Sequence, residues 1–303
     1  MSNNAENCAG DREGYIPVTG GLVWYRMTGP ARRRVPLLTL HGGPGAPHDY
    51  LEPLEDLADE RPVIFYDQLG CGKSDRPDAP TLWTVGHFIE ELGQVRQALG
   101  LERLHLLGQS WGGMLAVEYL LARGLSGVAS LILSAPFLST SRFVADQRAY
   151  LQEMPAAIRR VILDKEASGD FDSPEYQEAM AAYYRRHLCR LDPWPDCLNR
   201  AFAGLGVQVY RQMWGPSEFT MTGNLGKAEL VACLRKISLP VLLTCGRYDE
   251  STPETTAYYQ SRWPGAEMVV FEEASHMHHL EKQEHYLDMV RGFLRRVESA
   301  AAP

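Results

Sequence analysis

One stretch of the chain, residues 104–120, restricts the possible folds more than any other. It reads LHLLGQSWGGMLAVEYL: a short apolar run, then Gly-x-Ser-x-Gly, then a good helix-forming sequence. A serine on a tight strand-to-helix turn is typical of a nucleophile elbow. The flanking Gly108 and Gly112 have no Cβ, so strand and helix can approach closely. The sequence therefore predicts Ser110 as a nucleophile between a strand and a helix.

Further apolar runs indicate the sheet to which that strand belongs. They are short and almost wholly apolar, as expected for parallel strands covered on both faces: Val35–Leu40, Val63–Tyr66, Leu131–Leu133, Pro240–Cys245 and Met268–Phe271. Helical patterns at Val85–Leu99 and about Glu284–Val297 accompany them. Two runs flanking Gly20-Gly21, Tyr15–Val18 and Leu22–Arg26, predict a hairpin. The alternation predicts an α/β fold with a mostly parallel central sheet and helices on both faces.

The middle of the chain has a different character. From about Phe137 to Leu225 no strand-like run occurs, and helical patterns are broken by prolines. We expect residues 1–136 and 226–303 to form two parts of one α/β core. Residues 137–225 are then an inserted helical cap.

The composition excludes several classes of function. Lys plus Arg number 30 and Asp plus Glu 38, so the formal net charge is −8. An acidic chain is poorly suited to general nucleic-acid binding or to anionic membranes. We therefore expect neither nucleic acid nor a membrane as a partner, and the oligomeric state stays open.

The compartment is predicted from the N-terminal sequence and the cysteines. Residues 1–14 are polar and acidic, without the layout of a signal peptide, which predicts a cytoplasmic protein. The six cysteines contain no CxxC pair and are expected to be free thiols: Cys8, Cys71, Cys189, Cys197, Cys233 and Cys245.

Two later strands are followed by residues that complete a catalytic triad. One leads to Gly-Arg-Tyr-Asp-Glu, with Asp249 as the acid, and the next leads to Glu-Glu-Ala-Ser-His, with His276 as the base. The chain order Ser, Asp, His is that of nucleophile-elbow hydrolases. We predict that His276 deprotonates Ser110 and that Asp249 orients the imidazole.

Neighbouring residues offer competing choices. Glu250 follows Asp249, and His278 and His279 follow His276. The three histidines also suggest a metal site, but no HExxH or comparable ligand spacing accompanies them, and we predict none. We interpret His278 and His279 as surface or supporting residues.

The oxyanion hole is predicted from two glycine-rich positions. His-Gly-Gly-Pro-Gly follows an early strand, and glycine lets a backbone N–H approach a substrate carbonyl. We assign one donor to Gly43 and the other to Trp111, at the start of the helix after Ser110. The nearby Gly-Cys-Gly-Lys-Ser looks like a phosphate-binding loop, but Asp67 stands where that motif needs glycine. No nucleotide or other cofactor is therefore expected.

Together, His41–Gly45, Asp67–Ser74, Gly108–Gly113, Gly246–Glu250 and Ser275-His276 resemble the proline iminopeptidases, serine peptidases of the α/β-hydrolase fold. The similarity extends to tricorn-interacting aminopeptidases and L-amino-acid amide hydrolases, and covers about residues 21–294. It implies a helical cap and release of an N-terminal residue, often proline.

The resemblance also implies two acidic residues that hold the free α-amino group of the substrate. The match to the family's Gly-Pro-x-Glu-Phe segment is Trp214–Phe219, which assigns Glu218, and the residue after the triad aspartate is Glu250. Paired carboxylates can replace the hydration that an ammonium loses in a pocket.

We therefore predict a cofactor-free serine hydrolase acting on small peptides with an unblocked N-terminal residue, preferentially proline. The alternative is an L-amino-acid or L-proline amide hydrolase with the same triad. A general esterase, and a non-catalytic binding protein with this fold, are further alternatives.

Overall fold

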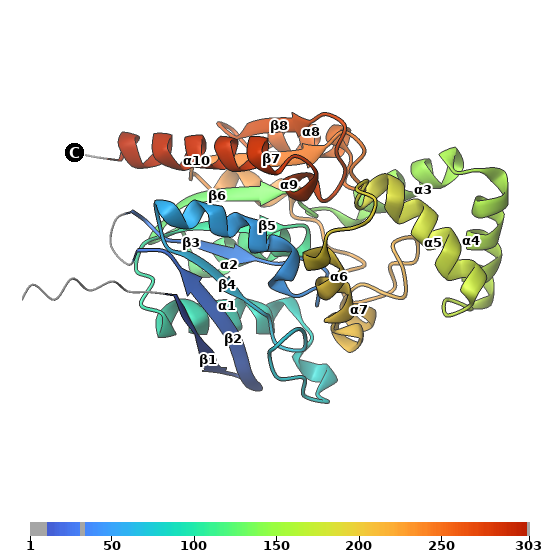
Figure 1. Cartoon of the computed structure of the whole chain (residues 1–303), viewed down its shortest axis with the longest axis horizontal. Helices are drawn as coiled ribbons and strands as arrows, with labels where there is room; N and C mark the ends of the chain where they lie inside the picture. The colour runs from blue at the N-terminus through green and yellow to red at the C-terminus, as the bar shows by residue number, and fades with distance from the viewer. Residues whose placement is uncertain (1–10, 31–33, 302–303) are drawn as a thin grey trace, which may run out of the picture.

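The computed structural model describes residues 11–30 and 34–301, and its centre is an eight-stranded sheet with the order β1-β2-β4-β3-β5-β6-β7-β8 (Figure 1). The strands are β1 Arg12–Val18, β2 Gly21–Thr28, β3 Leu37–Leu40, β4 Val63–Tyr66, β5 Leu104–Gln109, β6 Val128–Ser134, β7 Val241–Gly246 and β8 Glu267–Phe271. Strand β2 pairs antiparallel with β1 and β4, whereas β4, β3, β5, β6, β7 and β8 pair in parallel. The predicted mostly parallel sheet and its N-terminal hairpin are confirmed.

Helices cover both faces of this sheet. One face is packed by α1 Val85–Ala98, α2 Trp111–Arg123, the 3-10 helix η3 Val231–Lys236 and α8 Pro253–Ser261. The other is packed by the 3-10 helix η1 His48–Asp59, α9 His278–Glu281 and α10 Gln283–Ala300. A short 3-10 helix, η2 Pro80–Leu82, precedes α1. The central strands are wholly buried, which explains why their sequences are continuous apolar runs.

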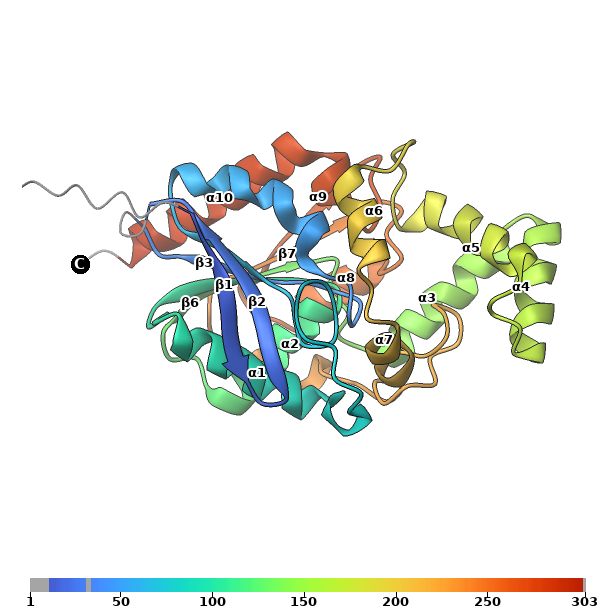
Figure 2. The ribbon, with the colours of Figure 1, turned by 60° about the horizontal axis from the view of Figure 1, so that its bottom comes forward.

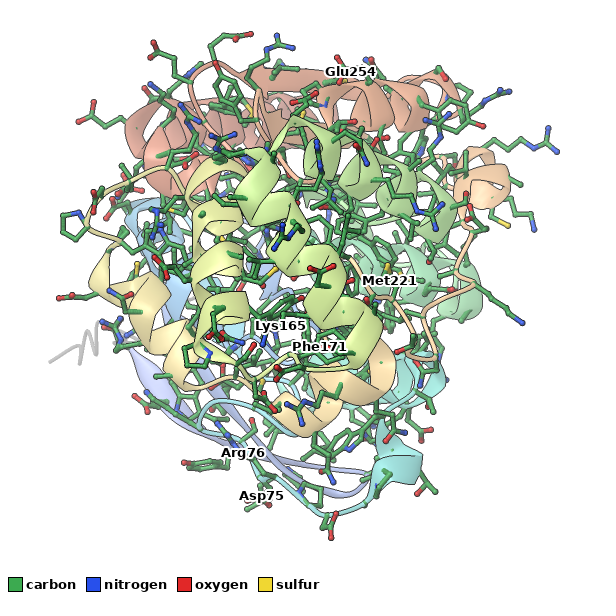
Figure 3. The ribbon with its side chains drawn as sticks, turned by 90° about the vertical axis from the view of Figure 1, so that its right-hand side faces the viewer. Asp75, Arg76, Lys165, Phe171, Met221 and Glu254 are labelled. Atoms are coloured by element: carbon green, nitrogen blue, oxygen red, sulfur yellow. The ribbon has the colours of Figure 1, made fainter. Side chains whose placement is uncertain are left out.

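Five helices between β6 and β7 form the cap: α3 Thr140–Glu153, α4 Ala156–Ser168, α5 Pro174–His187, α6 Asp196–Ala203 and α7 Val207–Met213. Figures 1 and 2 both show α3–α5 projecting beyond one end of the sheet, with α6 and α7 nearer to it. Helices α3–α5 share a small hydrophobic cluster that includes Leu151, Ile162 and Tyr183. Figure 3 faces the cap and shows Lys165 of α4 and Phe171 of the following loop on this side.

Several sequence expectations need correction in detail. The strand expected at Val35–Leu40 begins at Leu37, and the one expected at Leu131–Leu133 extends over Val128–Ser134. Helix η1 was not expected, because its 12 residues follow 3-10 geometry and contain Pro53. No helix among the described residues is long and apolar enough to cross a membrane.

The five described cysteines, Cys71, Cys189, Cys197, Cys233 and Cys245, are free thiols. Cys8 and the N-terminal residues 1–10 lie outside the described residues. The cytoplasmic location inferred mainly from them stays a prediction.

Candidate active site

Ser110 lies at the turn between β5 and α2. Its φ of 54° and ψ of −119° are a strained combination for a non-glycine residue, of the kind that concentrates at functional sites. A Cβ at Gly108 would overlap the carbonyl oxygen of Gly112, and a Cβ at Gly112 would overlap that of Leu40. Only glycine therefore permits the close approach of strand and helix that presents Ser110.

The two predicted oxyanion donors come from the loop after β3 and from the start of α2. Gly43 follows β3 with a φ of +105°, and Trp111 is the first residue of α2. Among the described residues, neither backbone N–H donates a hydrogen bond, so both are available to a ligand oxygen. Gly43, Ser110 and His276 line one cavity.

The turn after β4 is hydrogen-bonded to the loop that carries Gly43. The backbone N–H of Gln68 donates to His41 Nε2 at 2.9 Å, and its side-chain amide donates to the His41 carbonyl at 3.1 Å. Gln68 Oε1 accepts a hydrogen bond from the indole N–H of Trp111 at 2.9 Å. The turn thus links the loop that carries Gly43 to the helix that carries Trp111.

Asp249 and His276, which follow β7 and β8, are in direct contact. Asp249 Oδ1 lies 2.8 Å from His276 Nδ1 and also accepts the backbone N–H of Ser251 at 2.9 Å. The other oxygen, Oδ2, accepts the N–H of Gly246 at 3.2 Å. Both side chains are almost fully buried, so the carboxylate fixes the orientation of the ring.

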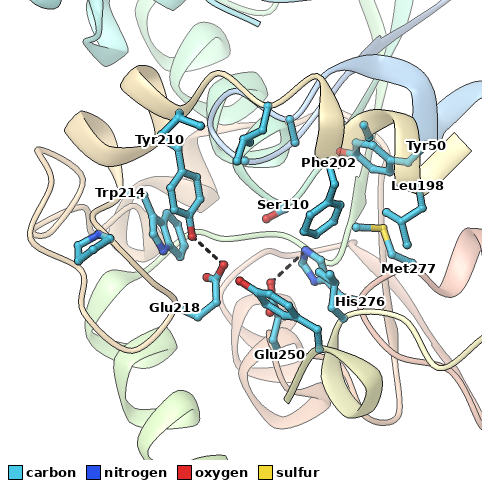
Figure 4. A pocket seen from close by; sticks show the side chains of 18 of the residues that line it. Tyr50, Ser110, Leu198, Phe202, Tyr210, Trp214, Glu218, Glu250, His276 and Met277 are labelled. Atoms are coloured by element: carbon cyan, nitrogen blue, oxygen red, sulfur yellow. Dashed lines mark hydrogen bonds and ion pairs between the residues drawn. The ribbon is translucent and has the colours of Figure 1, made fainter. Parts of the chain in front are cut away.

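Ser110 and His276 face the same cavity without a mutual hydrogen bond in the described structure (Figure 4). The imidazole Nε2 instead lies 3.4 Å from Glu250 Oε1. Catalytic hydrogen bonds are often long in unliganded enzymes and tighten when substrate binds. The structure therefore brings the three predicted triad residues to one place, with Glu250 beside the nitrogen that would receive the serine proton.

The spare histidines have structural partners. His278 Nε2 lies 2.8 Å from the Thr244 hydroxyl and 3.1 Å from that of Ser134, and His279 Nε2 lies 3.0 Å from the Tyr50 carbonyl. Burial lowers the pKa of both rings, to about 4 for His279. They are supporting residues and not surface residues, because the short helix α9 directs their side chains into the apolar layer beneath α10.

Glu218 and Glu250 bring two further carboxylates to the cavity. They come from a loop of the cap and from the loop after β7, and both are at least nine-tenths buried. Glu218 Oε1 accepts the hydroxyl of Tyr210 at 2.7 Å, whereas Glu250 Oε2 has no partner. Burial raises the pKa of Glu218 and raises that of Glu250 well above its ordinary value.

Burial lowers the pKa of His276, but the carboxylates of Glu250 and Asp249 outweigh this effect and raise it to about 9. Because Glu250 Oε1 and His276 Nε2 are buried and only 3.4 Å apart, the protonation of each group depends on that of the other. In the described structure no lysine or arginine pairs with Glu218 or Glu250. The two carboxyl groups therefore face the cavity without a basic side chain of the protein beside them.

Three other side chains have metal-ligand geometry, at a different place. Donor atoms of His48, Asp49 and Glu52 lie within 4.8 Å of one another. Arg200 already pairs with both Asp49 and Glu52, and His48 Nδ1 lies 2.7 Å from Asp67. These contacts give the cluster a structural role.

Comparison with known proteins shows the family to which the chain belongs. The family model of the alpha/beta hydrolase fold matches residues 35–283. A proline iminopeptidase of Heyndrickxia coagulans is 44% identical over 286 residues, which cover 94% of this chain and 99% of the relative. One from Lactobacillus crispatus is 38% identical over 286 residues, which cover 93% and 97%. The chain belongs to the proline iminopeptidase family.

A solved member of the family has the same architecture. The crystal structure of a proline iminopeptidase from Mycobacterium smegmatis matches with a TM-score of 0.89 at 36% identity, over 96% of this chain and 100% of the other. The fold class and family expected from the motifs are therefore confirmed.

Within this family fold, the cap holds the loop that carries Asp249 and Glu250. Gln147 of α3 donates its amide to the Glu250 carbonyl at 2.8 Å, and Tyr150 donates its hydroxyl to the Asp249 carbonyl at 2.9 Å. The backbone N–H of His276 donates to the carbonyl of His187, at the end of α5, at 3.0 Å. The cap is therefore joined to the backbone of the acid and the base.

Glu166 of α4 performs a similar task for the loop around Glu218. Its Oε1 accepts hydroxyl hydrogen bonds from Ser217 at 2.6 Å and Tyr176 at 2.7 Å, and its Oε2 accepts one from Thr220. Ser217 and Thr220 flank Glu218, so one carboxylate fixes the loop on both sides. Sequence reasoning missed Glu166, since it lies 52 residues before Glu218 in an ordinary helical pattern.

Proposed function

We propose that this chain is a serine aminopeptidase that releases an unblocked N-terminal residue, preferentially proline, from small peptides. Two supports are independent of each other. The relatives named above are proline iminopeptidases along nearly their whole length. The cavity combines a strained serine, an acid-paired histidine and two buried carboxylates.

The observation that carries the proposal is the pair Glu218 and Glu250. Buried carboxylates without a lysine or arginine partner are unfavourable, and a substrate ammonium supplies the missing charge. The secondary ammonium of an N-terminal proline has two N–H donors, one for each carboxylate. Tyr210 and Trp214, whose stacked rings are 6.3 Å apart, give the adjoining wall a flat apolar surface for the pyrrolidine ring.

Acylation starts at Ser110. His276 Nε2 takes the hydroxyl proton while Oγ attacks the carbonyl carbon of the first residue, and Asp249 stabilises the imidazolium that forms. The N–H groups of Gly43 and Trp111 stabilise the tetrahedral oxyanion. His276 then gives the proton to the leaving nitrogen, and the C–N bond breaks to leave an ester on Ser110.

Deacylation uses the same groups with water as the nucleophile. His276 takes a proton from water as its oxygen attacks the ester carbonyl, and returns that proton to Ser110 Oγ when the ester bond breaks. The clamp residues Glu218 and Glu250 hold the amine throughout. An amine held one carbon away from the reacting carbonyl fixes the scissile bond against Ser110.

The test compares prolyl p-nitroanilide with its N-acetyl form, in the wild type and in Glu218→Gln. For the wild type we expect kcat/KM to be at least about 100-fold higher with the free amine, because charge-assisted pairs in a buried site contribute several kcal/mol. E218Q should remove most of this preference by lowering turnover of the free-amine substrate. Glu273→Gln, which alters an exposed carboxylate, is the matched control.

Equal turnover of free and acetylated substrates by the wild type would disprove the amine clamp. An unchanged ratio in E218Q would remove Glu218 from it. Complete absence of labelling by a fluorophosphonate would favour a non-catalytic binding protein instead.

A further inference from the structure

The cavity that contains Ser110 has two ends of different chemistry. Its volume is about 370 Å³. In Figure 4, Glu218, Tyr210 and Trp214 lie on one side of Ser110 and His276. On the other side the wall is apolar and is formed by Leu198 and Phe202 of α6, by Met277 before α9 and by the ring of Tyr50 of η1.

The packing of the molecule separates these ends as well. Trp214 belongs to the hydrophobic cluster on the α1 and α2 face of the sheet. Leu198, Met277 and Tyr50 belong to the cluster on the η1 and α10 face. The cavity therefore runs across the top of the sheet from one cluster to the other, with the nucleophile in between.

Phe202 is the unusual residue of the apolar end. It lies on α6, and its side chain is 42% exposed although it is a large aromatic group lining a cavity. It contacts the rings of Trp194 and Tyr184, with centroids 5.2 and 6.1 Å away. An apolar wall left accessible inside a cleft is typical of a ligand-binding surface.

The chemistry of the substrate decides what reaches this wall. In an N-terminal residue the amine nitrogen and the scissile carbonyl carbon are separated by one carbon atom. With the amine at Glu218 and Glu250 and the carbonyl at Ser110, the leaving nitrogen and all that it bears point away from the clamp. Free ammonia would leave this end of the cavity empty, whereas an amino acid places its side chain there.

We propose that the wall formed by Leu198, Phe202 and Met277 is a subsite for an apolar side chain on the residue that follows the released proline. The inference rests on the proposed aminopeptidase function. The expected substrates are then peptides with an apolar second residue, in preference to simple amino acid amides. Phe202 is expected to determine this specificity.

The test measures kcat/KM for prolinamide and for the C-amidated dipeptides Pro-Phe, Pro-Gly, Pro-Asp and Pro-Lys. Burying an aromatic side chain should favour Pro-Phe amide over Pro-Gly amide by about 10- to 100-fold, with Pro-Asp amide poorer still. Phe202→Ala should lower the ratio of Pro-Phe amide to prolinamide by about tenfold. Leu163→Ala, which removes another exposed apolar side chain of the cap, is the matched control and should leave the ratio unchanged.

A second variant keeps the test independent of simple loss of packing. Phe202→Asp should raise Pro-Lys amide relative to Pro-Phe amide, because the subsite then carries a negative charge. Similar kcat/KM for all dipeptides and prolinamide in the wild type would overturn the subsite while leaving the aminopeptidase function intact. No turnover of any proline substrate, prolyl p-nitroanilide included, would overturn both.

Discussion

The sheet and the cap contribute to one cavity by different means. Ser110, Asp249 and His276 each follow the end of a parallel strand, so backbone geometry places them. Glu218 lies in an irregular cap loop, which is held by hydrogen bonds that Ser217 and Thr220 donate to Glu166 of α4. The difference suggests a division of labour: the sheet supplies the reaction and the cap selects the substrate. Variants of the sheet should then affect all substrates, and variants of the cap only those with a free amine.

The largest expected effect comes from a residue that the sheet positions. Asp249→Asn should lower kcat by about 10⁴-fold, because the amide stabilises the wrong imidazole tautomer. The loss should be similar for prolyl p-nitroanilide and for an ester without an amine. Asp288→Asn, at an exposed position on α10, is the control. If D249N kept more than a tenth of the wild-type activity, Asp249 would not be the acid of the triad. Glu250, whose carboxylate lies beside Nε2, would then have to be the partner of His276.

A smaller effect on all substrates is expected from Tyr50→Phe. The Tyr50 hydroxyl accepts the backbone N–H of Gly42 at 2.6 Å and donates to Gln109 Oε1 at 2.7 Å, so it joins the oxyanion loop to the residue before the nucleophile. Leaving buried partners unsatisfied should lower kcat by about tenfold, with little change in KM. If kcat fell only for free-amine substrates, Tyr50 would act in substrate binding and not in support of the oxyanion loop.

The part of the site that could be predicted from sequence matches this division. The serine, acid and base follow apolar strands in short motifs, so a local pattern was enough to name them. Glu218 was named only through a family resemblance, because nothing in its own segment distinguishes a buried carboxylate from a solvated one. Glu166 and Tyr50 have no local signal, since their roles depend on hydrogen bonds to residues 51 and 59 positions away in the chain.

The fold shows the same limit. Fully buried strands have continuous apolar sequences and were predicted with small errors at their ends. Helix η1 was missed because it follows 3-10 geometry around Pro53. The sequence leaves open whether His278 and His279 are surface or supporting residues, because burial of a polar ring depends on partners from distant segments: Thr244 and Ser134 for His278, and the Tyr50 carbonyl for His279.

Glu166→Ala tests the cap. Without the carboxylate, Ser217, Thr220 and Tyr176 lose a shared acceptor, and the loop carrying Glu218 loses its fixed position. We expect KM for free-amine substrates to rise about fivefold, with kcat and the turnover of amine-free esters little changed. Glu166→Gln, which retains one acceptor oxygen, should recover part of the loss, and Glu175→Ala, an exposed cap carboxylate, should show none. Equal losses on esters would mean that Glu166 supports the fold and not the clamp.

The smallest expected effect concerns Glu250, which lies in the loop after β7 and belongs to the proposed amine clamp. A fluorophosphonate carries no amine, so its reaction with Ser110 reports on the free enzyme and requires unprotonated His276. With the pKa of His276 raised to about 9, the rate should increase with pH into the alkaline range. Glu250→Gln removes the nearest carboxylate and should lower the midpoint by about one pH unit. Glu254→Gln, exposed on α8, should leave it unchanged.

The same pair links amine binding to catalysis. A bound ammonium competes with the imidazole for Glu250, so His276 should lose its proton at a lower pH in the enzyme–substrate complex than in the free enzyme. The acidic limb of kcat should then lie below that of kcat/KM in the wild type, because the first reports the complex and the second the free enzyme. In E250Q the two limbs should nearly coincide. Coinciding limbs in the wild type would show that the clamp and the base act independently, and would restore a strict separation between substrate selection and chemistry.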